Sequence, residues 1–341
     1  MVGAVVVSRG RVVGEGFHRR AGEEHAEVAA LRKAGARARG ADLYVTLEPC
    51  DHFGRTPPCT AAIRGAGIAR VIAALADPNP LSGSGARALR RGGIAVRFAG
   101  GSLARRAERQ NERFLVALSR GRPFVLAKWA ATLDGRIADR SRASRWITGE
   151  PARRRALLLR EEHDAVLVGA GTVAADDPLL TRRLGKNPAR HWRIVVSGRL
   201  RLPEDARLFR SLEGLVVATA LPERHPRVRR LSRRGVEIWS LPSRSGRVLP
   251  RDLLRRMRRA GISSVLVEGG GATLAAFFEA GVVDRVCVFL APRIFGAGPA
   301  AVEGAGFPLA RAPRLSGVEV ERLGEDVMVT GALAGASRRS R

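Results

Sequence analysis

The fold of the first third of the chain follows from one stretch of sequence, Thr46-Leu47-Glu48-Pro49-Cys50-Asp51-His52-Phe53-Gly54-Arg55-Thr56-Pro57-Pro58-Cys59, together with His25-Ala26-Glu27 upstream of it. Two thiolates and an imidazole suit zinc better than a hard cation such as magnesium. A catalytic zinc site takes three protein ligands and leaves the fourth position to water. The pattern therefore predicts that His25, Cys50 and Cys59 bind one zinc ion.

Glu27 lies two residues after His25 and need not bind the metal. A carboxylate at such a site can take a proton from water and later pass protons to a leaving amine. Residues two apart on a helix point about 200° apart, so His25 and Glu27 can share a site only at a helix N-terminus. We therefore expect one helix from about His25 to Ala34, and a second that opens at Cys59, where the helix dipole favours a thiolate.

The order of these residues also carries information. His-x-Glu followed by Pro-Cys-x-x-Cys is the signature of zinc deaminases that act on nucleobases. Here eight residues, not two, separate Cys50 from Cys59. The alternative is a chance His-x-Glu with two buried free cysteines. The proline before Cys50 and the strand-like run that leads into it favour the metal site.

Short apolar runs alternate with helical stretches along both halves of the chain. This order predicts a mixed sheet covered by helices in the first half, with strands at residues 2–7, 11–17, 42–47, 69–75 and 94–98. The composition of residues 119–123 is typical of a linker. The strands predicted after it are 124–131, 165–168, 193–196, 215–219, 236–239, 264–267 and 285–290. We thus expect a zinc-dependent deaminase domain over 1–118, a linker over 119–123, a second α/β domain over 124–333 and a disordered tail over 334–341.

Composition narrows the class of protein. The chain has 341 residues, enough for two ordinary domains, and its longest apolar runs are far too short to span a bilayer. No signal peptide opens the chain, so we expect a cytoplasmic protein. Three cysteines cannot build a disulfide framework.

The net charge of +28 would suit nucleic-acid binding, because basic surfaces attract phosphates. However, Lys33, Lys128 and Lys186 are the only lysines, and the arginines are scattered along the chain. Codon bias in a GC-rich genome explains this composition more simply. We therefore expect no nucleic-acid partner and no membrane partner.

Five separated motifs resemble, in the same order, those of the bifunctional deaminase/reductases of riboflavin biosynthesis. The first is the zinc loop, whose long cysteine spacing and Gly-Arg-Thr-Pro-Pro-Cys ending are distinctive of that family. The others are found at residues 77–80, at 132–136 with 144–148, at 171–181 and at 267–271. The likeness covers nearly the whole chain.

This resemblance implies an α/β fold of two domains, a cytidine-deaminase-like mixed sheet with helices and a dihydrofolate-reductase-like α/β domain. It implies zinc-dependent hydrolytic deamination of 2,5-diamino-6-ribosylamino-4(3H)-pyrimidinone 5′-phosphate, and then NADPH-dependent reduction of the ribosyl group to ribityl. The cofactors would be one zinc ion per chain and NADPH, and the partner a small phosphorylated pyrimidine. Family members commonly form homo-oligomers through the reductase domain.

The resemblance also implies binding residues. Those for NADPH are Lys128, Trp146, Thr172, Asp176, Gly270, Gly271, Ala272 and Thr273. Those for substrate are His18, His52 and Arg55 in the first domain and Ser144, Arg160, Leu180, Arg183 and Glu268 in the second.

Several of these residues have plainer explanations. The glycines after Glu268 either cradle a phosphate at a helix N-terminus or only permit a tight strand-to-helix turn. Arg160 and Arg183 suit a sugar phosphate, but either could be a solvated surface charge. Trp146 could be an ordinary core residue, and His52 could have a structural role beside the metal.

Two other functions fit parts of the pattern. A tRNA adenosine deaminase-like enzyme shares His-Ala-Glu and the Glu-Pro-Cys turn, but the long cysteine spacing and the motifs of the second half count against it. A non-catalytic, zinc-stabilised nucleic-acid-binding protein would normally supply four metal ligands, and the sequence offers three. Ammonia release and NADPH oxidation on the pyrimidine substrate would separate the three possibilities.

Family members usually carry a leading helix and an Asn-Pro pair before the first strand, whereas here Met1 falls almost directly on Val2-Gly3-Ala4. Uncovered apolar surface forgoes roughly 25 cal/mol per Å², and the asparagine helps to hold the pyrimidine. We therefore expect the chain to reduce well, to deaminate slowly and to have a less stable first domain. An upstream extension with the Asn-Pro pair should raise both ammonia release and the melting temperature. Equal rates with and without it would contradict this expectation.

Overall fold

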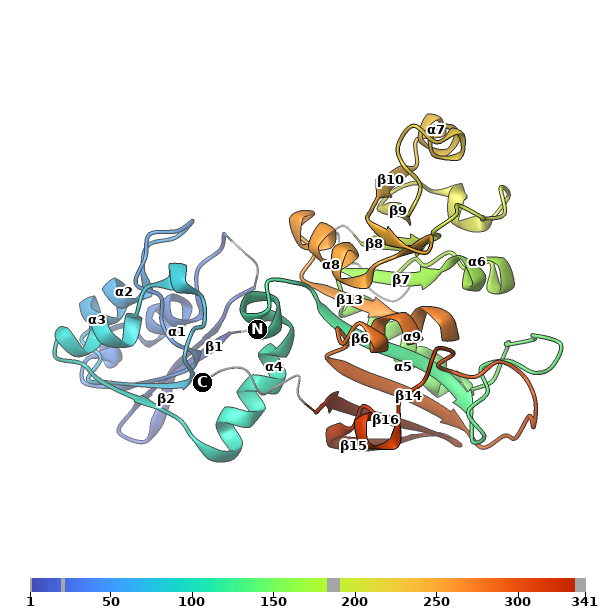
Figure 1. Ribbon diagram of the computed structural model, residues 1–341. Coiled ribbons are helices and arrows are strands. Elements are labelled where there is room, and N and C mark those ends of the chain that lie inside the picture. The colour runs from blue at the N-terminus through green and yellow to red at the C-terminus, as the bar shows by residue number, and fades with distance from the viewer. Residues whose placement is uncertain (1, 20–21, 183–190, 335–341) are drawn as a thin grey trace. The chain divides into compact units, whose positions relative to one another are not determined.

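Two sheets organise the chain, one in each of two units, Met1–Arg120 and Gly121–Arg341 (Figure 1). The structure, a computed structural model, describes residues 2–19, 22–182 and 191–334. The predicted tail lies outside these residues, apart from Ala334.

The first unit contains the mixed sheet that the sequence predicts. Its elements are β1 (Gly3–Ser8), β2 (Arg11–Phe17), α1 (Ala26–Ala34), β3 (Asp42–Leu47), α2 (Cys59–Gly65), β4 (Arg70–Leu75), α3 (Gly85–Arg91), β5 (Ala95–Phe98) and α4 (Gly101–Ser119), with 3-10 turns at Gly35–Ala38 and Pro80–Ser82. The strand order is β2-β1-β3-β4-β5. Strands β1, β2 and β3 pair antiparallel, whereas β3, β4 and β5 pair parallel. The predicted strands and helices of this half are confirmed.

Helix α1 consists mostly of strong helix formers and covers one face of this sheet. It ends at Gly35, whose positive φ of 56° suits glycine. Ala30 of α1 packs with Val6 of β1 and Leu43 of β3 in one buried cluster, which also contains Cys50 and Cys59. The metal-ligand candidates therefore lie at the border of the core.

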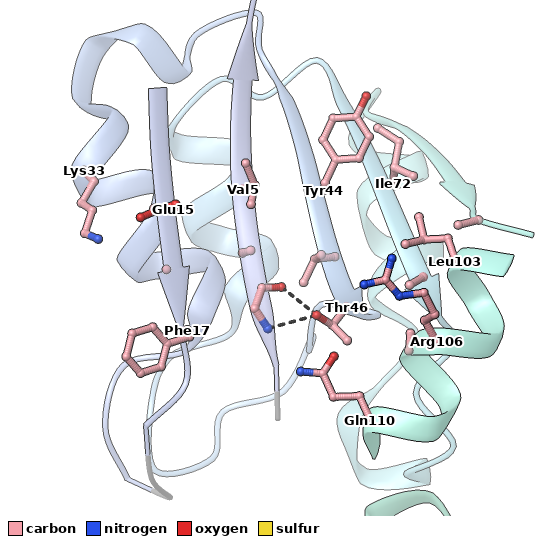
Figure 2. Close-up of a pocket in the computed structure, with 17 residues that line it drawn as sticks. Val5, Glu15, Phe17, Lys33, Tyr44, Thr46, Ile72, Leu103, Arg106 and Gln110 are labelled. Atoms are coloured by element: carbon pink, nitrogen blue, oxygen red, sulfur yellow. Dashed lines mark hydrogen bonds between the residues drawn. The ribbon is translucent and has the colours of Figure 1, made fainter. Parts of the chain in front are cut away.

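The opposite face of the sheet is hollowed. Figure 2 shows Val5, Tyr44 and Ile72 on this face, with Leu103 and Arg106 of α4 at one end. The hollow has a volume of about 550 Å³, and Tyr44 is 40% exposed. What this open face does to deamination stays a prediction.

The second unit is built on a nine-stranded sheet of order β10-β9-β8-β7-β13-β6-β14-β16-β15. Its strands are β6 (Phe124–Thr132), β7 (Ala165–Gly169), β8 (Trp192–Val196), β9 (Leu215–Thr219), β10 (Glu237–Ser240), β13 (Ser264–Val267), β14 (Arg285–Ala291), β15 (Leu315–Leu323) and β16 (Asp326–Leu333). A separate hairpin is formed by β11 (Ser243–Arg244) and β12 (Arg247–Val248). The helices are α5 (Glu150–Glu161), α6 (Ala170–Asp176), α7 (Pro226–Arg233), α8 (Pro250–Arg259) and α9 (Gly271–Glu279), with 3-10 turns at Arg207–Arg210 and Leu309–Arg311.

Seven neighbouring strands of this sheet run parallel, in the order β10-β9-β8-β7-β13-β6-β14, and helices cover both faces of this part of the sheet (Figure 1). Helices α8 and α9 pack in one buried cluster with alternate residues of these strands, and α6 and α7 in another. Strands buried on both faces read as continuous apolar runs, as in β7, where every residue is buried. Because β7 and β13 are parallel neighbours, their carboxyl ends lie at the same edge of the sheet.

The C-terminal hairpin of β15 and β16 was not among the expected strands. Strand β16 pairs antiparallel with β14 and with β15, and β15 is the last strand of the sheet. Val318 and Val320 are 52% and 68% exposed, so β15 lacks the buried apolar face that makes a strand easy to recognise from sequence. The alternation of valine and glutamate along 318–321 is the signal that could have revealed it.

We predict that residues 122–333 fold and work alone. Arg122 pairs with buried Asp284 at 2.7 Å, and Asp284 also accepts a hydrogen bond from Val125 at 2.9 Å, so the start of this fragment is tied to its own core. The fragment should bind NADPH and reduce the deaminated intermediate, as measured by fluorescence titration and NADPH oxidation. A fragment with native-like circular dichroism that binds no NADPH would refute the division of the chain into two domains that work independently.

Candidate functional site

Three metal-ligand candidates converge in the first unit. His25 is the N-cap of α1, Cys50 follows β3, and Cys59 is the first residue of α2. The Nδ1 atom of His25 lies 3.1 Å from Cys59 Sγ and 3.5 Å from Cys50 Sγ. All three ligand atoms lie within 4.8 Å of one another. Two sulfurs and one nitrogen at this spacing fit a zinc ion, as the sequence predicts.

Close packing of α1 on β2 holds His25 in this place. A Cβ atom at Gly16 of β2 would lie 2.4 Å from the carbonyl oxygen of Ala26, closer than atoms can approach. Only glycine therefore lets the first turn of α1 lie against the strand. Because α1 begins at Ala26, His25 and Glu27 lie at the helix end, which is the geometry that their spacing requires.

Glu27 is 4% exposed, and burial raises its pKa above the ordinary carboxyl value. Its side chain shares a hydrogen bond with Cys59, and it also interacts electrostatically with His25. A buried carboxyl with a raised pKa beside a metal site can both accept and donate a proton. This is the property that proton transfer in deamination requires.

The two sulfurs share one hydrogen bond. The thiol of Cys59 donates to Cys50, and this bond lowers the pKa of Cys50 to about 4. The same bond, with burial, raises the pKa of Cys59. The hydrogen bond with Cys50 also raises the pKa of His25. One thiolate therefore forms readily in this site, and a cation would replace the shared proton.

The loop between the cysteines is held by polar contacts. Thr60 donates to Asp51 at 2.6 Å, and the amide of Asp51 donates to the carbonyl of Ser82 at 2.7 Å. Glu48 accepts from the amide of Ala86 at 2.9 Å, at the start of α3. These bonds join the loop to residues 77–86, the segment that contains the Asp-Pro-Asn-Pro motif.

The predicted substrate residues of this unit are His18, His52 and Arg55. The ring of His18 packs edge-on against the ring of His25, with centroids 5.2 Å apart. His52 Nδ1 is buried and has no hydrogen-bond partner among the described residues. Arg55 is exposed, and its Cδ would lie 3.8 Å from a Cβ at Gly22. The structure thus brings His18 to the metal ligands, and His52 and Arg55 lie on the loop that carries two of them.

In the second unit, two predicted substrate residues bind each other. Arg160 donates to both carboxylate oxygens of Glu268, at 2.8 and 2.7 Å. Burial opposes ionisation of Glu268, but the charges of Arg160 and Lys128 outweigh it and lower its pKa to about 2. Arg160 is therefore not a solvated surface charge, and Glu268 remains ionised at neutral pH.

Two of the predicted cofactor residues, Thr172 and Gly270, meet at the edge where β7 and β13 end. The amide of Gly270 donates to Thr172 Oγ1 at 2.9 Å. Gly270 is the N-cap of α9, and no side chain caps this helix in the described structure. A Cβ at Gly269 would lie 2.6 Å from Thr273 Cβ, so the turn is tight. The first amides of α9, which include those of Gly271 and Ala272, fit a phosphate group.

Trp146 is 61% exposed and is therefore not a core residue. The guanidinium of Arg153 lies 4.7 Å from its ring centroid, and that of Arg145 lies 5.8 Å away. Ser144 donates to the carboxylate of Asp176 at 2.6 Å, and Arg145 donates to the carbonyl of the same residue. This segment is therefore tied to the end of α6, the helix that also contains Thr172.

Leu180 differs from the other predicted substrate residues of this unit. Leu180 is 1% exposed and its side chain belongs to a core cluster, so only its backbone is available to a ligand. Its φ is +57°. Arg183 lies outside the described residues.

Some contacts could not be expected from the motifs. Thr56 Oγ1 lies 3.2 Å from His25 Nε2, and Arg153 stacks on Trp146. The Arg-Thr-Pro-Pro-Cys ending pointed to the loop of Thr56, but not to its contact. No sequence signal distinguishes Arg153 from the other arginines of α5.

Comparisons with known proteins agree with this geometry. Residues 1–75 match the family model described as the cytidine and deoxycytidylate deaminase zinc-binding region, and residues 123–329 match the RibD C-terminal domain. The riboflavin biosynthesis protein RibD of Aquifex aeolicus is 41% identical over 96% of this chain and 90% of that protein.

Solved structures agree as well. RibD of Acinetobacter baumannii, form 1, has a TM-score of 0.84 at 35% identity, over 98% of this chain and 92% of that one. The diaminohydroxyphosphoribosylaminopyrimidine deaminase/5-amino-6-(5-phosphoribosylamino)uracil reductase of Thermotoga maritima has a TM-score of 0.84 at 37% identity, with the same coverage.

We predict that Cys50→Ser and Cys59→Ser each lose the bound zinc, because a hydroxyl replaces one of only three ligands. Elemental analysis of the purified variants should find far less than one zinc per chain. Cys287→Ser is the matched control, since this buried cysteine lies on β14 of the other unit. Full zinc content in both loop variants would rule out the assigned ligands.

Proposed function

Because the chain belongs to the RibD family of riboflavin-biosynthesis proteins, we propose roles for its residues in two consecutive reactions. The chain is a zinc-dependent deaminase and an NADPH-dependent reductase. It deaminates 2,5-diamino-6-ribosylamino-4(3H)-pyrimidinone 5′-phosphate and then reduces the ribosyl group to ribityl. Neither a tRNA deaminase nor a non-catalytic zinc protein is favoured, since residues 123–329 match a reductase domain.

The observation that carries the deaminase mechanism is buried Glu27 beside His25, Cys50 and Cys59. Zinc held by these three ligands supplies the Lewis acidity that makes water nucleophilic near neutral pH. The carboxylate of Glu27 accepts a proton from the attacking water. Its protonated form, which burial favours, then donates to the departing amine.

Three further residues bind the substrate of this domain. His18 lies against the His25 ring and can contact the pyrimidine beside this metal ligand. His52 offers a buried ring nitrogen with an unused hydrogen bond among the described residues. Arg55, exposed on the same loop, suits the 5′-phosphate, because a guanidinium binds phosphate through two hydrogen bonds.

In the reductase domain, Gly270, Gly271, Ala272 and Thr273 contact the phosphates of NADPH at the start of α9, where the amides of Gly271 and Ala272 donate to them. Thr172 orients this turn through its bond to Gly270. Lys128 on β6, Trp146 and Asp176 line the remainder of the cofactor site. Hydride transfer is the chemistry of the cofactor, and these residues align it with the ribosyl group.

Glu268 and Arg160 bind the substrate as a unit. Arg160 satisfies both oxygens of Glu268 but each oxygen retains a lone pair, so the ionised Glu268 can accept from a ribosyl hydroxyl. Ser144 lies beside the cofactor residue Asp176, Leu180 contributes its backbone, and Arg183 binds the phosphate.

We assign the deaminase domain to residues 1–118, the linker to 119–123 and the reductase domain to 124–333. We also propose that the chain forms a homo-oligomer through its reductase domain and acts in the cytoplasm. The exposed outer edge of β15, with Val318 and Val320, supports an interface there, because unpaired strand edges readily pair with another chain. No helix among the described residues has the length and apolar character needed to cross a membrane.

Nucleic acid is not among the proposed partners. Several arginines have structural roles that explain them without a phosphate ligand. Arg193 is 3% exposed and donates to the carbonyls of Leu179, Leu208, Ser211 and Glu213. Arg122 is likewise paired with buried Asp284.

We predict that Glu27→Gln keeps its zinc but loses deamination, since an amide cannot exchange protons with water or amine. The loss of a general acid–base group lowers the rate roughly 10²–10⁴-fold. Ammonia release, zinc content and NADPH oxidation with the deaminated intermediate as substrate should be measured on the same preparation, and only the first should fall. Glu24→Gln is the control, because Glu24 is exposed and pairs with Arg32. Near-normal ammonia release by Glu27→Gln would exclude the assigned role.

A further inference from the structure

The two ring nitrogens of His25 face different partners. Nδ1 points toward the sulfurs of Cys59 and Cys50, at 3.1 and 3.5 Å, whereas Nε2 lies 3.2 Å from Thr56 Oγ1. A metal binds a ring nitrogen through its lone pair, so the neutral imidazole must carry its proton on the other nitrogen. With the sulfurs on the Nδ1 side, the proton belongs on Nε2, and Thr56 is its acceptor.

Thr56 is itself held in place by the loop. Its carbonyl accepts a hydrogen bond from the amide of Gly54 at 3.2 Å. The next two residues are Pro57 and Pro58, whose rings restrict the backbone, and Pro58 is the N-cap of α2. As a β-branched residue, threonine also has few side-chain rotamers. The hydroxyl is therefore directed at Nε2 by a stiff segment that ends at the ligand Cys59.

This contact gives the long spacing between the cysteines a physical role. The eight residues between Cys50 and Cys59 include Thr56, which a spacing of two residues has no room to supply. A histidine ligand almost always donates its second N–H to an acceptor, and loss of that acceptor typically weakens metal binding about 10–100-fold.

We propose that Thr56 is a positioning residue for the metal site: its hydroxyl accepts the Nε2–H of His25 and so keeps Nδ1 free for zinc. The proposal rests on the proposed zinc site and extends it. Thr56 acts through His25 and does not touch the reacting atoms.

The test compares three variants of the full-length chain. Thr56→Val removes the hydroxyl at almost constant volume, Thr56→Ser retains it, and Thr46→Val removes a hydroxyl that bonds only the backbone of Gly3 (Figure 2). The zinc dissociation constant is measured by competition with a chromophoric chelator. The absorption spectrum of the Co²⁺-substituted protein reports the ligand geometry.

Thr56→Val should bind zinc about 10–100-fold more weakly and should shift the Co²⁺ spectrum, whereas Thr56→Ser and Thr46→Val should resemble the original protein. NADPH-dependent reduction of the deaminated intermediate should be the same in all four proteins. Wild-type zinc affinity in Thr56→Val would overturn the proposal. Equal weakening in Thr56→Ser would also overturn it, since the hydroxyl would then not matter.

A direct measurement does not depend on how the variants fold. In the zinc-loaded original protein, ¹⁵N shifts of His25 should show a protonated Nε2 and a metal-bound Nδ1. The opposite assignment would overturn the proposal. Cys50→Ser separates this inference from the proposed zinc site: if it loses zinc while Thr56→Val does not, only the role of Thr56 fails.

Discussion

Both sites depend on the close approach of a helix N-terminus to the sheet. In the first unit, Gly16 lets the first turn of α1 lie against β2, and His25 and Glu27 follow from that placement. In the second, a Cβ at Gly169, where β7 ends, would lie 2.3 Å from Thr273 Oγ1 of α9. Backbone amides at a helix start are unpaired and favour negative groups. The same constraint thus places His25 and Glu27 at the start of α1 and, in our proposal, a phosphate group at the start of α9.

The two sites use buried carboxyl groups in opposite ways. No arginine or lysine among the described residues is paired with Glu27, and burial raises the pKa of its carboxyl group, which favours proton exchange. The side chain of Glu268 is only 8% exposed, but Arg160 binds both of its oxygens and keeps it ionised. One carboxyl is therefore suited to transferring protons and the other to accepting hydrogen bonds. Burial alone does not decide which of these two roles a carboxyl group has, because its charge also depends on the residues that contact it.

Much of the fold and of the metal site was predictable because it depends on local pattern. Apolar periodicity located the strands of the first unit, and the spacing of His25 and Glu27 required a helix to begin between the ligand and the acid. The β15–β16 hairpin was missed, since β15 buries almost none of its residues. The pairing of Arg160 with Glu268 could not be foreseen, because the two residues lie 108 positions apart in the sequence. Nor could the burial of Leu180, whose side chain packs in the core.

By itself, then, the sequence determined the chemistry of this protein: which residue types bind the metal, which acid accompanies them, and which turns can approach a phosphate. These follow from short spacings, in which a few bonds fix the distance between functional groups. Only the tertiary structure decided how those groups are tuned. The raised pKa of Glu27, the ionised state of Glu268 and the contact of Thr56 with His25 all arise between segments that are joined by packing rather than by sequence.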